Sequence, residues 1–138
     1  MTAEHLSPHE ALISAMVLMA AAQPPISDAE VARMTQLVRE LPVFSDLTPG
    51  AVPAATEACL ALLAEPDGID RALDLVRHAL PMRLRETAYL LACEVAAADG
   101  ETEQEELRML QSLRIGLELD RLVAGAIERA SRARYQIV

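Results

Sequence analysis

The chain has 138 residues, of which 52 % are hydrophobic and 2 % aromatic, and its twelve basic and twenty-one acidic side chains give a formal net charge of −9. The apolar residues are chiefly Ala, Leu, Val, Ile and Met, which favour helices packed on one another over a pleated sheet, so we expect a single all-α domain over 1–138. A negative field repels phosphate backbones and anionic lipid headgroups, and this excludes nucleic acid and acidic membranes from the expected partners.

A first pair of helices is predicted by two capping boxes, in each of which a serine is followed three residues later by a glutamate. Ser7 with Glu10 opens a helix that must end before Pro24-Pro25, because a proline cannot donate to a helical ladder. Ser27 with Glu30 opens the next helix in the same way. The expected helices are 8–22 and 28–41, with core positions Leu12, Met16, Met19, Val31, Met34, Leu37 and Leu41.

Three further helices are separated by proline and glycine. Pro53 begins a predicted helix that runs to about Ala64, and the Pro66-Asp67-Gly68 turn separates it from the next, which Pro81 closes. The fifth predicted helix starts at about Met82 and ends before a second turn signal. The expected core positions of the fourth and fifth helices are Ile69, Leu73, Val76, Leu80, Leu84, Ala88, Leu91 and Val95.

Two more helices complete the chain, which makes about seven. Thr102 with Glu105 predicts a third capping box, and Gly116 predicts the C-terminal stop of the sixth helix. The last helix is expected over about 118–132. The expected core positions are Leu107, Leu110, Leu113 and Leu117, followed by Leu119, Leu122, Val123, Ala126 and Ile127.

The first and last parts of the chain form an internal repeat. Sliding the sequence by 76 positions places Glu10 on Glu86, Glu30 on Glu106, and one run of three alanines on another. Repeat one, about 7–41, therefore corresponds to repeat two, about 83–117. Because two helices cannot bury their apolar faces alone, we expect the two units to pack against each other about an approximate two-fold axis in a compact bundle.

Acidic residues gather at the junction between the fifth and sixth helices, where five carboxylates fall within the eight residues 99–106. Like charges at close range cost about 1 kcal/mol per pair even in water, and a hard cation held by oxygen ligands would offset that cost. A standard EF-hand loop is excluded, because its first and third ligand positions would lack side-chain oxygens. The remaining hypothesis is a weak Mg²⁺ or Ca²⁺ site formed by Asp99, Glu103, Glu106 and waters.

A purely structural role fits the same residues. Acidic side chains in the first turn of a helix complement its macrodipole, and Asp99-Gly100 is typical of a turn. Glu94 lies a little more than one turn before this junction, where it would either reach the cation or, as is more usual, be solvated. In the first copy Gln23-Pro24-Pro25 stands at the equivalent junction, so we expect any cation binding in the second loop alone.

Other reactive side chains predict no site. Cys59 and Cys93 fall in apolar helical runs, where buried and reduced thiols are expected in a cytoplasmic protein. His5, His9 and His78 show no zinc spacing, and no segment is long and apolar enough to suggest membrane insertion. No nucleophile with a base, phosphate loop or cofactor loop can be named, so we expect neither an enzyme nor a bound organic cofactor.

The stretch 96–107 carries three alanines, Asp-Gly, an acidic spacer and a glutamate that opens an amphipathic helix. This pattern resembles the repeat of TerB-like proteins of tellurite resistance, and the segment 16–37 looks like the same pattern in eroded form. The resemblance covers about 7–117. It implies a compact seven-helix domain with internal pseudosymmetry, an acidic surface that holds metal, and a cytoplasmic role linked to tellurite resistance and envelope stress. The first junction departs from the pattern because its Asp-Gly is absent.

Three functions remain open from the sequence. The first is a non-enzymatic cytoplasmic scaffold of the TerB-like stress type, which binds a divalent cation weakly at the 99–106 loop and presents an acidic face to a partner protein. The second is a metal-free module that forms a homodimer or binds a helical partner through the last helix and the tail Tyr135–Val138. The third function is an enzyme, and no catalytic side chains can be named for it.

Overall fold

Seven α-helices make up the computed structural model over the residues that it describes, which are 5–100 and 103–138 without the side chain of Asp99. No strand occurs in these ranges, so the predicted all-α class is confirmed. In chain order the elements are α1 (Pro8–Ala21), α2 (Asp28–Glu40), the 3₁₀ turn η1 (Pro42–Phe44), α3 (Ala51–Leu63), α4 (Gly68–Ala79), α5 (Met82–Ala96), the 3₁₀ turn η2 (Ala97–Asp99), α6 (Gln104–Gly116) and α7 (Arg121–Arg134).

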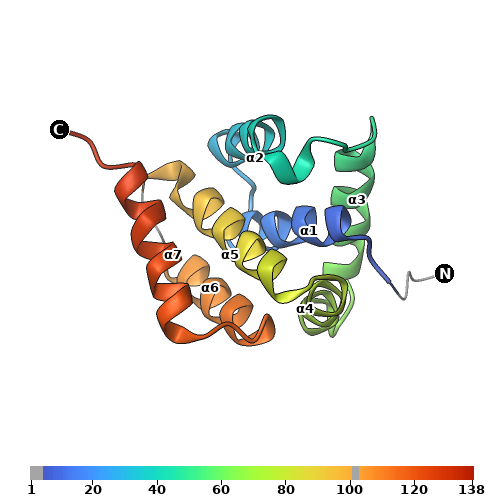
Figure 1. Ribbon diagram of the computed structural model, residues 1–138. Coiled ribbons are helices and arrows are strands. Elements are labelled where there is room, and N and C mark those ends of the chain that lie inside the picture. Colours follow the sequence, from blue (N-terminus) through green and yellow to red (C-terminus); the bar gives the residue numbers. More distant parts are fainter. Residues whose placement is uncertain (1–4, 101–102) are drawn as a thin grey trace.

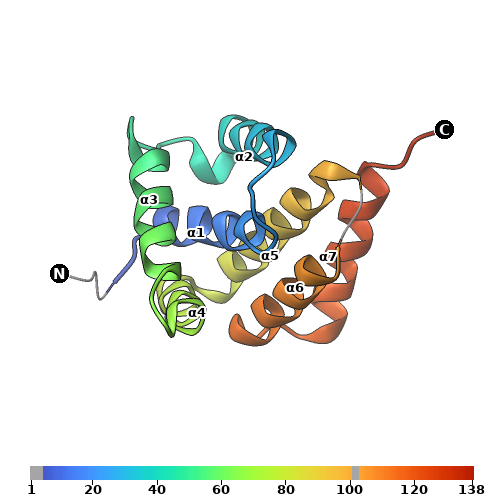
Figure 2. The ribbon, with the colours of Figure 1, turned by 180° about the vertical axis from the view of Figure 1, so that it is seen from behind.

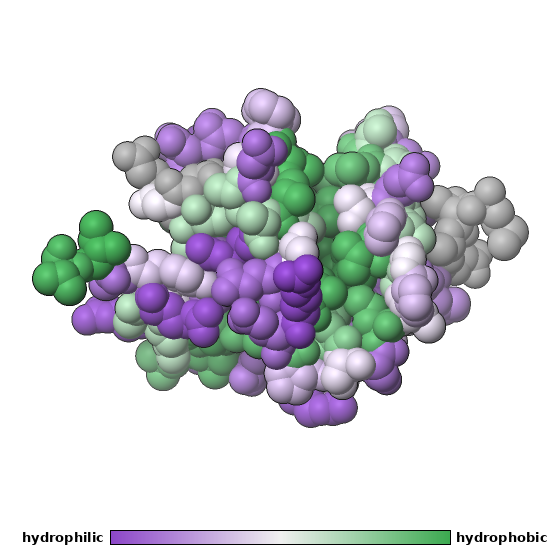
Figure 3. Space-filling model, turned by 90° about the horizontal axis from the view of Figure 1, so that it is seen from above, coloured by the Kyte–Doolittle hydropathy of each residue, from purple (hydrophilic) through white to green (hydrophobic). Residues whose placement is uncertain are grey.

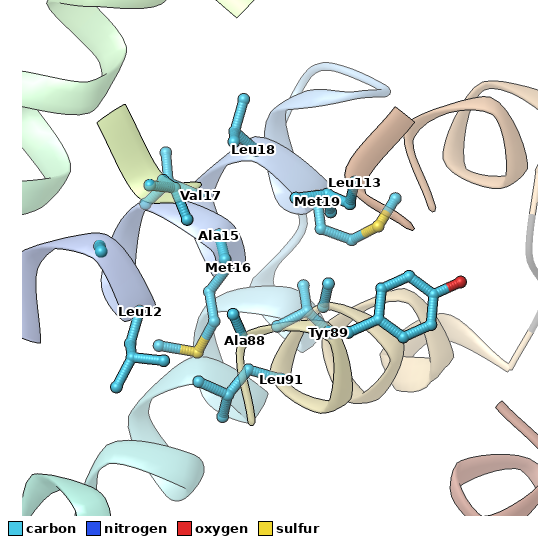
Figure 4. Close-up of a cluster of buried hydrophobic side chains, with 14 of the residues drawn as sticks. Leu12, Ala15, Met16, Val17, Leu18, Met19, Ala88, Tyr89, Leu91 and Leu113 are labelled. Carbon is cyan, nitrogen blue, oxygen red and sulfur yellow. The ribbon is translucent and has the colours of Figure 1, made fainter. Parts of the chain in front are cut away.

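Helix α1 is the centre of the fold, with α3, α4, α5 and α6 packed around it (Figures 1 and 2). Every residue from Ala11 to Ala20 is at most 5 % exposed. A helix buried on all sides needs apolar residues all round, which explains the almost unbroken apolar run of this segment. Met16 points from α1 toward Leu91 of α5, and Met19 lies beside Leu113 of α6 (Figure 4).

The predicted capping boxes define the starts of α1 and α2. The Ser7 and Ser27 hydroxyls accept hydrogen bonds of 3.1 and 3.0 Å from the backbone N–H groups of Glu10 and Glu30. Each glutamate in turn accepts the backbone N–H of its serine at 2.8 Å. These paired bonds satisfy helix N–H groups that have no partner within the helix.

The bounds of α2 and α6 agree with the offset found in the sequence. Both helices have 13 residues, and the first residue of α6, Gln104, lies 76 positions after the first residue of α2, Asp28. Helix α1 and helix α5, which precede them, pack tightly against each other in the core. A two-fold rotation that relates the two units stays a prediction.

Two predicted helix starts are wrong by two or three residues. Helix α3 begins at Ala51 rather than Pro53, because Gly50 adopts a left-handed conformation with φ of 83° and starts the helix earlier. Helix α7 begins at Arg121 rather than 118, because the Asp120 carboxylate caps the N–H of Leu122 at 2.7 Å.

The start and end of α6 also differ from the prediction. Its capping box joins Glu103 and Glu106, one residue later than the predicted box of Thr102 with Glu105; Thr102 lies outside the described residues. The helix ends at Gly116 as predicted, but the residue with positive φ is Glu118, at 58°.

Several predicted core positions at the starts of helices face solvent. Val31 is 51 % exposed and Leu107 is 56 % exposed, although Leu37 and Leu113 on the same helices are buried. Val31 and Leu107 occupy equivalent positions of the repeat, as do Leu37 and Leu113. The first turns of α2 and α6 therefore bury one side, which carries Glu30 and Glu106, and leave Val31 and Leu107 on the other side in solvent. Ile69, in the first turn of α4, is likewise 46 % exposed.

Helix α7 presents a different face to the body from the one predicted. Its buried residues are Ala124 and Ser131, whereas Leu122 is 84 % exposed. Of the positions predicted as core, Leu119 is buried but precedes the helix, and Ile127 is partly buried against the core. The face differs because polar side chains of α7, among them Glu128 and Ser131, contact side chains of α5.

Helix α2 lies across the molecule on the side seen in Figure 3, which shows polar side chains over it and a band of hydrophobic surface beside it. Arg39 and Glu40 are exposed at its C-terminal end. Its N-terminal end turns inward toward the start of α6, and these two helix starts form the candidate site.

Candidate functional site

The starts of α2 and α6 meet at a shared cavity of about 250 Å³, which we name the acidic corner. Three carboxylates reach it, one from α2 and two from the start of α6. The described residues that line the acidic corner are Gln23, Pro24, Pro25, Ser27, Glu30, Glu103 and Glu106.

The two most buried carboxylates of the acidic corner are equivalent in the repeat. Glu30 and Glu106 are each 3 % exposed. Glu30 accepts the backbone N–H of Ser27 at 2.8 Å, and Glu106 accepts the backbone N–H of Glu103 at 3.1 Å. Because each lies in the first turn of a helix, the positive end of a helix macrodipole stabilises its negative charge. The same carboxylates thus cap both helices and place negative charge in one cavity.

The structure brings together part of the predicted metal set. Glu103 and Glu106 line the same cavity, while the side chain of Asp99 lies outside the described residues. Across the described side chains, no three carboxylate, histidine or cysteine groups lie close enough together to hold a metal ion. A cation at this corner would therefore depend on a ligand beyond Glu30, Glu103 and Glu106, such as Asp99 or water.

Glu30 lines the acidic corner, although it is absent from the metal set predicted from the sequence. The first junction lacks the Asp-Gly pair, and for that reason cation binding was expected in the second loop alone. In the structure Glu30 of the first copy lines the same cavity as the glutamates of the second. The signal was present, because the 76-residue offset aligns Glu30 with Glu106.

Apart from the acidic corner, a cluster of polar side chains from α7 surrounds the carboxylate of Glu94 at the end of α5. Glu94 is 2 % exposed, so the expectation of a solvated side chain is wrong. Its Oε2 accepts the Ser131 hydroxyl at 2.7 Å, and its Oε1 accepts the Tyr135 hydroxyl at 2.7 Å and lies 3.1 Å from Arg134 Nε. A buried charge is costly unless it is paired and hydrogen-bonded, and here donors from α7 satisfy both oxygens.

Arg33 extends the Glu94 cluster to α2. Its Nη1 donates to the backbone carbonyl of Glu94 at 2.7 Å, and its guanidinium lies 4.0 Å from the centre of the Tyr135 ring. The Arg134 guanidinium lies 5.4 Å from the same ring. The Tyr135 ring therefore has a cation–π contact with each of two arginines, and α2, α5 and the end of α7 meet at one place.

Comparison with known proteins places the chain in a family. The family described as tellurite resistance protein TerB matches residues 9–128. The chain belongs to the TerB family. The match spans α1 to α6 and the first half of α7, and it includes the acidic corner. No curated protein and no solved structure matches the chain.

The two thiols of this TerB-family chain are unpaired and buried. Burial raises the pKa of Cys93 to about 12, with a further contribution from the negative charges of Glu128 and Glu94. Burial also raises the pKa of Cys59. A nucleophilic cysteine needs a lowered pKa, so the surroundings of both thiols keep them protonated and agree with their predicted place in the core.

The described residues include no helix long and apolar enough to cross a membrane. His9 and His78 each lie close to a backbone carbonyl oxygen. His9 Nε2 lies 2.9 Å from the Val43 carbonyl oxygen and 3.3 Å from an Asp46 carboxylate oxygen, and His78 Nδ1 lies 2.7 Å from the Asp74 carbonyl oxygen.

Proposed function

We propose that this TerB-family chain is a non-enzymatic cytoplasmic scaffold of the stress-response type, which binds a divalent cation weakly at the acidic corner and presents its acidic surface to a partner protein. The observation that supports the cation is the single cavity shared by Glu30, Glu103 and Glu106. The formal charge of −9 supports a partner with a basic surface, because opposite charges steer association.

Mg²⁺ or Ca²⁺ fits the chemistry of the acidic corner. Both ions prefer carboxylate, carbonyl and water oxygens, and a bound cation would complement the negative charge that three carboxylates bring to this cavity. Glu30 and Glu106 each use one oxygen to accept a backbone N–H. We therefore expect few direct protein ligands, several bound waters and weak affinity.

Calorimetric titration with Mg²⁺, Ca²⁺ and Zn²⁺ tests the cation. We expect binding heat with the wild-type chain and its loss in Asp99→Asn, Glu103→Gln and Glu106→Gln. Glutamine retains an oxygen that can accept the capping N–H, so Glu106→Gln removes charge while it keeps the helix start. Glu57→Gln, at an exposed position of α3, is the matched control and should bind like the wild type.

Glu30→Gln separates a cavity shared by both copies from a site confined to the second loop. If the cation lies between α2 and α6, this variant should bind more weakly than the wild type. Binding equal to the wild type would restrict the site to the second loop, and no heat with any of the three ions in the wild-type chain would remove the cation from the proposal.

Tellurite resistance is the cellular role that we propose from the family. The supporting observation is the match to the tellurite resistance protein TerB over residues 9–128. Growth of a tellurite-sensitive bacterium with and without the chain tests this role. Equal growth inhibition in both cultures would contradict it without bearing on the cation.

A metal-free interaction module is the second candidate, and an apolar groove favours it. The groove, with a volume of about 480 Å³, lies between the end of α1, α3, the start of α4, and α6. Leu60 and Ile69 line it and are 41 % and 46 % exposed, and Glu105 and Arg108 add polar groups. Helical partners bind through grooves of this kind. Light scattering at two concentrations tests self-association, and Ile69→Ser should weaken any dimer that uses the groove.

A further inference from the structure

Helix α7 is attached to the body largely through polar contacts. Only Ala124 and Ser131 of its residues are buried, and its main packing partner is α5. Glu128 accepts the hydroxyl of Tyr89 at 2.5 Å, and further along the helix Glu94 accepts hydrogen bonds from Ser131 and Tyr135. A helix held by apolar burial would place a continuous hydrophobic stripe against its neighbour, whereas the apolar contact of α7 with the core comes mainly from Ala124 and the partly buried Ile127.

The contact also lies at an edge of the molecule. Helix α7 covers α5 and α6 from one side, and its other side faces solvent (Figures 1 and 2). The central helix α1 packs with α3, α4, α5 and α6. Separation of α7 from α5 would therefore leave the packing around α1 in place.

We propose that residues Arg121–Tyr135 form a releasable strap, held closed by a latch in which Ser131, Arg134 and Tyr135 bind the buried carboxylate of Glu94. When the strap opens, the face of α5 and α6 beneath it meets solvent. This strap is a conformational device of the chain and does not depend on cation binding.

An open cavity beneath the strap shows where α7 is incompletely packed against α5 and α6. It has a volume of about 220 Å³ and lies between α5, α6 and α7. Its apolar lining comes mainly from Ala96, Ala97, Leu107 and Leu110, and Cys93 borders it. Because this contact is not packed solid, part of the dispersion energy that would hold α7 in place is absent.

The donors of the latch lie beyond the family match. TerB similarity covers residues 9–128, whereas Ser131, Arg134 and Tyr135 follow that range. The acceptor, Glu94, lies inside it. The latch therefore joins a position within the matched domain to residues that the match does not cover, so the family resemblance does not account for it.

The two cysteines provide the experiment. Cys93 borders the cavity beneath the strap, whereas Cys59 lies between α1 and α3, away from α7. The full chain is treated with iodoacetamide and the modification rate of each cysteine is measured by peptide mass spectrometry. The variants are Tyr135→Phe and Ser131→Ala, each of which removes one hydrogen bond to Glu94. Glu86→Gln, at an exposed position on the same helix as Glu94, is the matched control.

We expect each latch variant to raise the modification rate of Cys93 by roughly tenfold, because each variant removes one hydrogen bond to a charged group and so weakens the closed state. The Cys59 rate should stay unchanged, and Glu86→Gln should behave like the wild type. Equal increases at Cys59 and Cys93 would show that the whole domain unfolds together and would overturn the strap. An unchanged Cys93 rate in both variants would also overturn it.

Hydrogen exchange of the wild-type chain gives a test that needs no variant. Amides of α7 should exchange through a local opening, with less protection than amides of α1, which require global unfolding. Identical opening free energies for α7 and α1 would contradict an independent strap. This result would stand even if a latch variant failed to fold.

Discussion

Helices α1 and α7 each have 14 residues, yet they are held in the fold in different ways. Helix α1 is buried on every side, with each residue from Ala11 to Ala20 at most 5 % exposed. Helix α7 buries Ala124 and Ser131 and relies on hydrogen bonds to side chains of α5. Helix α1 therefore forms the interior of the domain, whereas α7 packs against its outer side.

The difference shows how stability is distributed in this fold. Burial of apolar surface contributes roughly 25 cal/mol per Å², and close packing makes each methylene group count. A hydrogen bond contributes about 0.5–1.5 kcal/mol net, because water competes for the same groups in the unfolded chain. We therefore expect substitutions in α1 to affect the whole domain and substitutions in α7 to affect mainly its own attachment.

The largest expected effect on the free energy of unfolding comes from replacing a leucine by alanine, and the same change is made in each helix for comparison. Leu12→Ala in α1 should lower the free energy of unfolding by about 2–5 kcal/mol, because the Leu12 side chain is fully buried and its removal leaves a cavity. Leu122→Ala in α7 should change it by less than about 0.5 kcal/mol, because Leu122 is 84 % exposed. Chemical denaturation measures both. Similar losses in the two variants would contradict the distinction between the helices.

A smaller effect, on the pH dependence of stability, should come from the Cys93 thiol beneath α7. Burial raises the pKa of Cys93 to about 12, above the ordinary value of 9.0, so the folded chain keeps a proton that the unfolded chain releases. The stabilising contribution of Cys93 is present below about pH 9 and is lost as the pH rises toward 12. We expect the wild type to lose roughly 2 kcal/mol from this source by about pH 10.5.

Denaturation of Cys93→Ala at about pH 8 and about pH 10.5 isolates that contribution. The variant should lose less stability between the two pH values than the wild type does. Some loss should remain, because burial also raises the pKa of Cys59 and of Tyr89. Equal losses in variant and wild type would mean that the Cys93 thiol ionises as easily in the folded chain as in the unfolded one.

Tyr89→Phe tests the first polar contact along α7. The variant keeps the buried ring and removes the hydroxyl that donates to Glu128 at 2.5 Å. Glu128 is partly exposed and can bind water instead, so we expect a loss of about 1 kcal/mol. Hydrogen exchange should show that the loss falls on α7 amides more than on those of α1. A uniform loss across both helices would place the Tyr89 contact within the common core.

The fold followed from local signals wherever those signals were complete within a few residues. Ser7 with Glu10 and Ser27 with Glu30 define helix starts through hydrogen bonds that span three residues, and the structure has both. The exposure of Val31 could not be predicted in this way, because helical spacing identifies an apolar face but does not say how far the neighbouring helix reaches along it. The same reason applies to the exposed Leu107.

The candidate site was predicted in part because its residues come from distant segments. Glu103 and Glu106 are close in sequence and were identified there, whereas Glu30 joins them only through the packing of α2 beside α6. Glu94 was taken as a solvated position because a lone glutamate on a helix usually is. Its partners Ser131, Arg134 and Tyr135 lie about 40 residues further along the chain, so only the tertiary structure could reveal them.

A last comparison uses the N-terminal caps of the two helices. Asp120→Ala removes the side chain that accepts the N–H of Leu122 at 2.7 Å, and Ser7→Ala removes the hydroxyl that accepts the N–H of Glu10 at 3.1 Å. An N-cap contributes about 1 kcal/mol in either helix, so the chemistry of the two changes is matched. Ser7→Ala should lower the protection of amides throughout the core, because α1 cannot fray without exposing it. Asp120→Ala should lower the protection of α7 amides alone. If both variants reduce core protection equally, α7 is part of the same cooperative unit as α1, and its polar attachment is as permanent as the apolar packing at the centre.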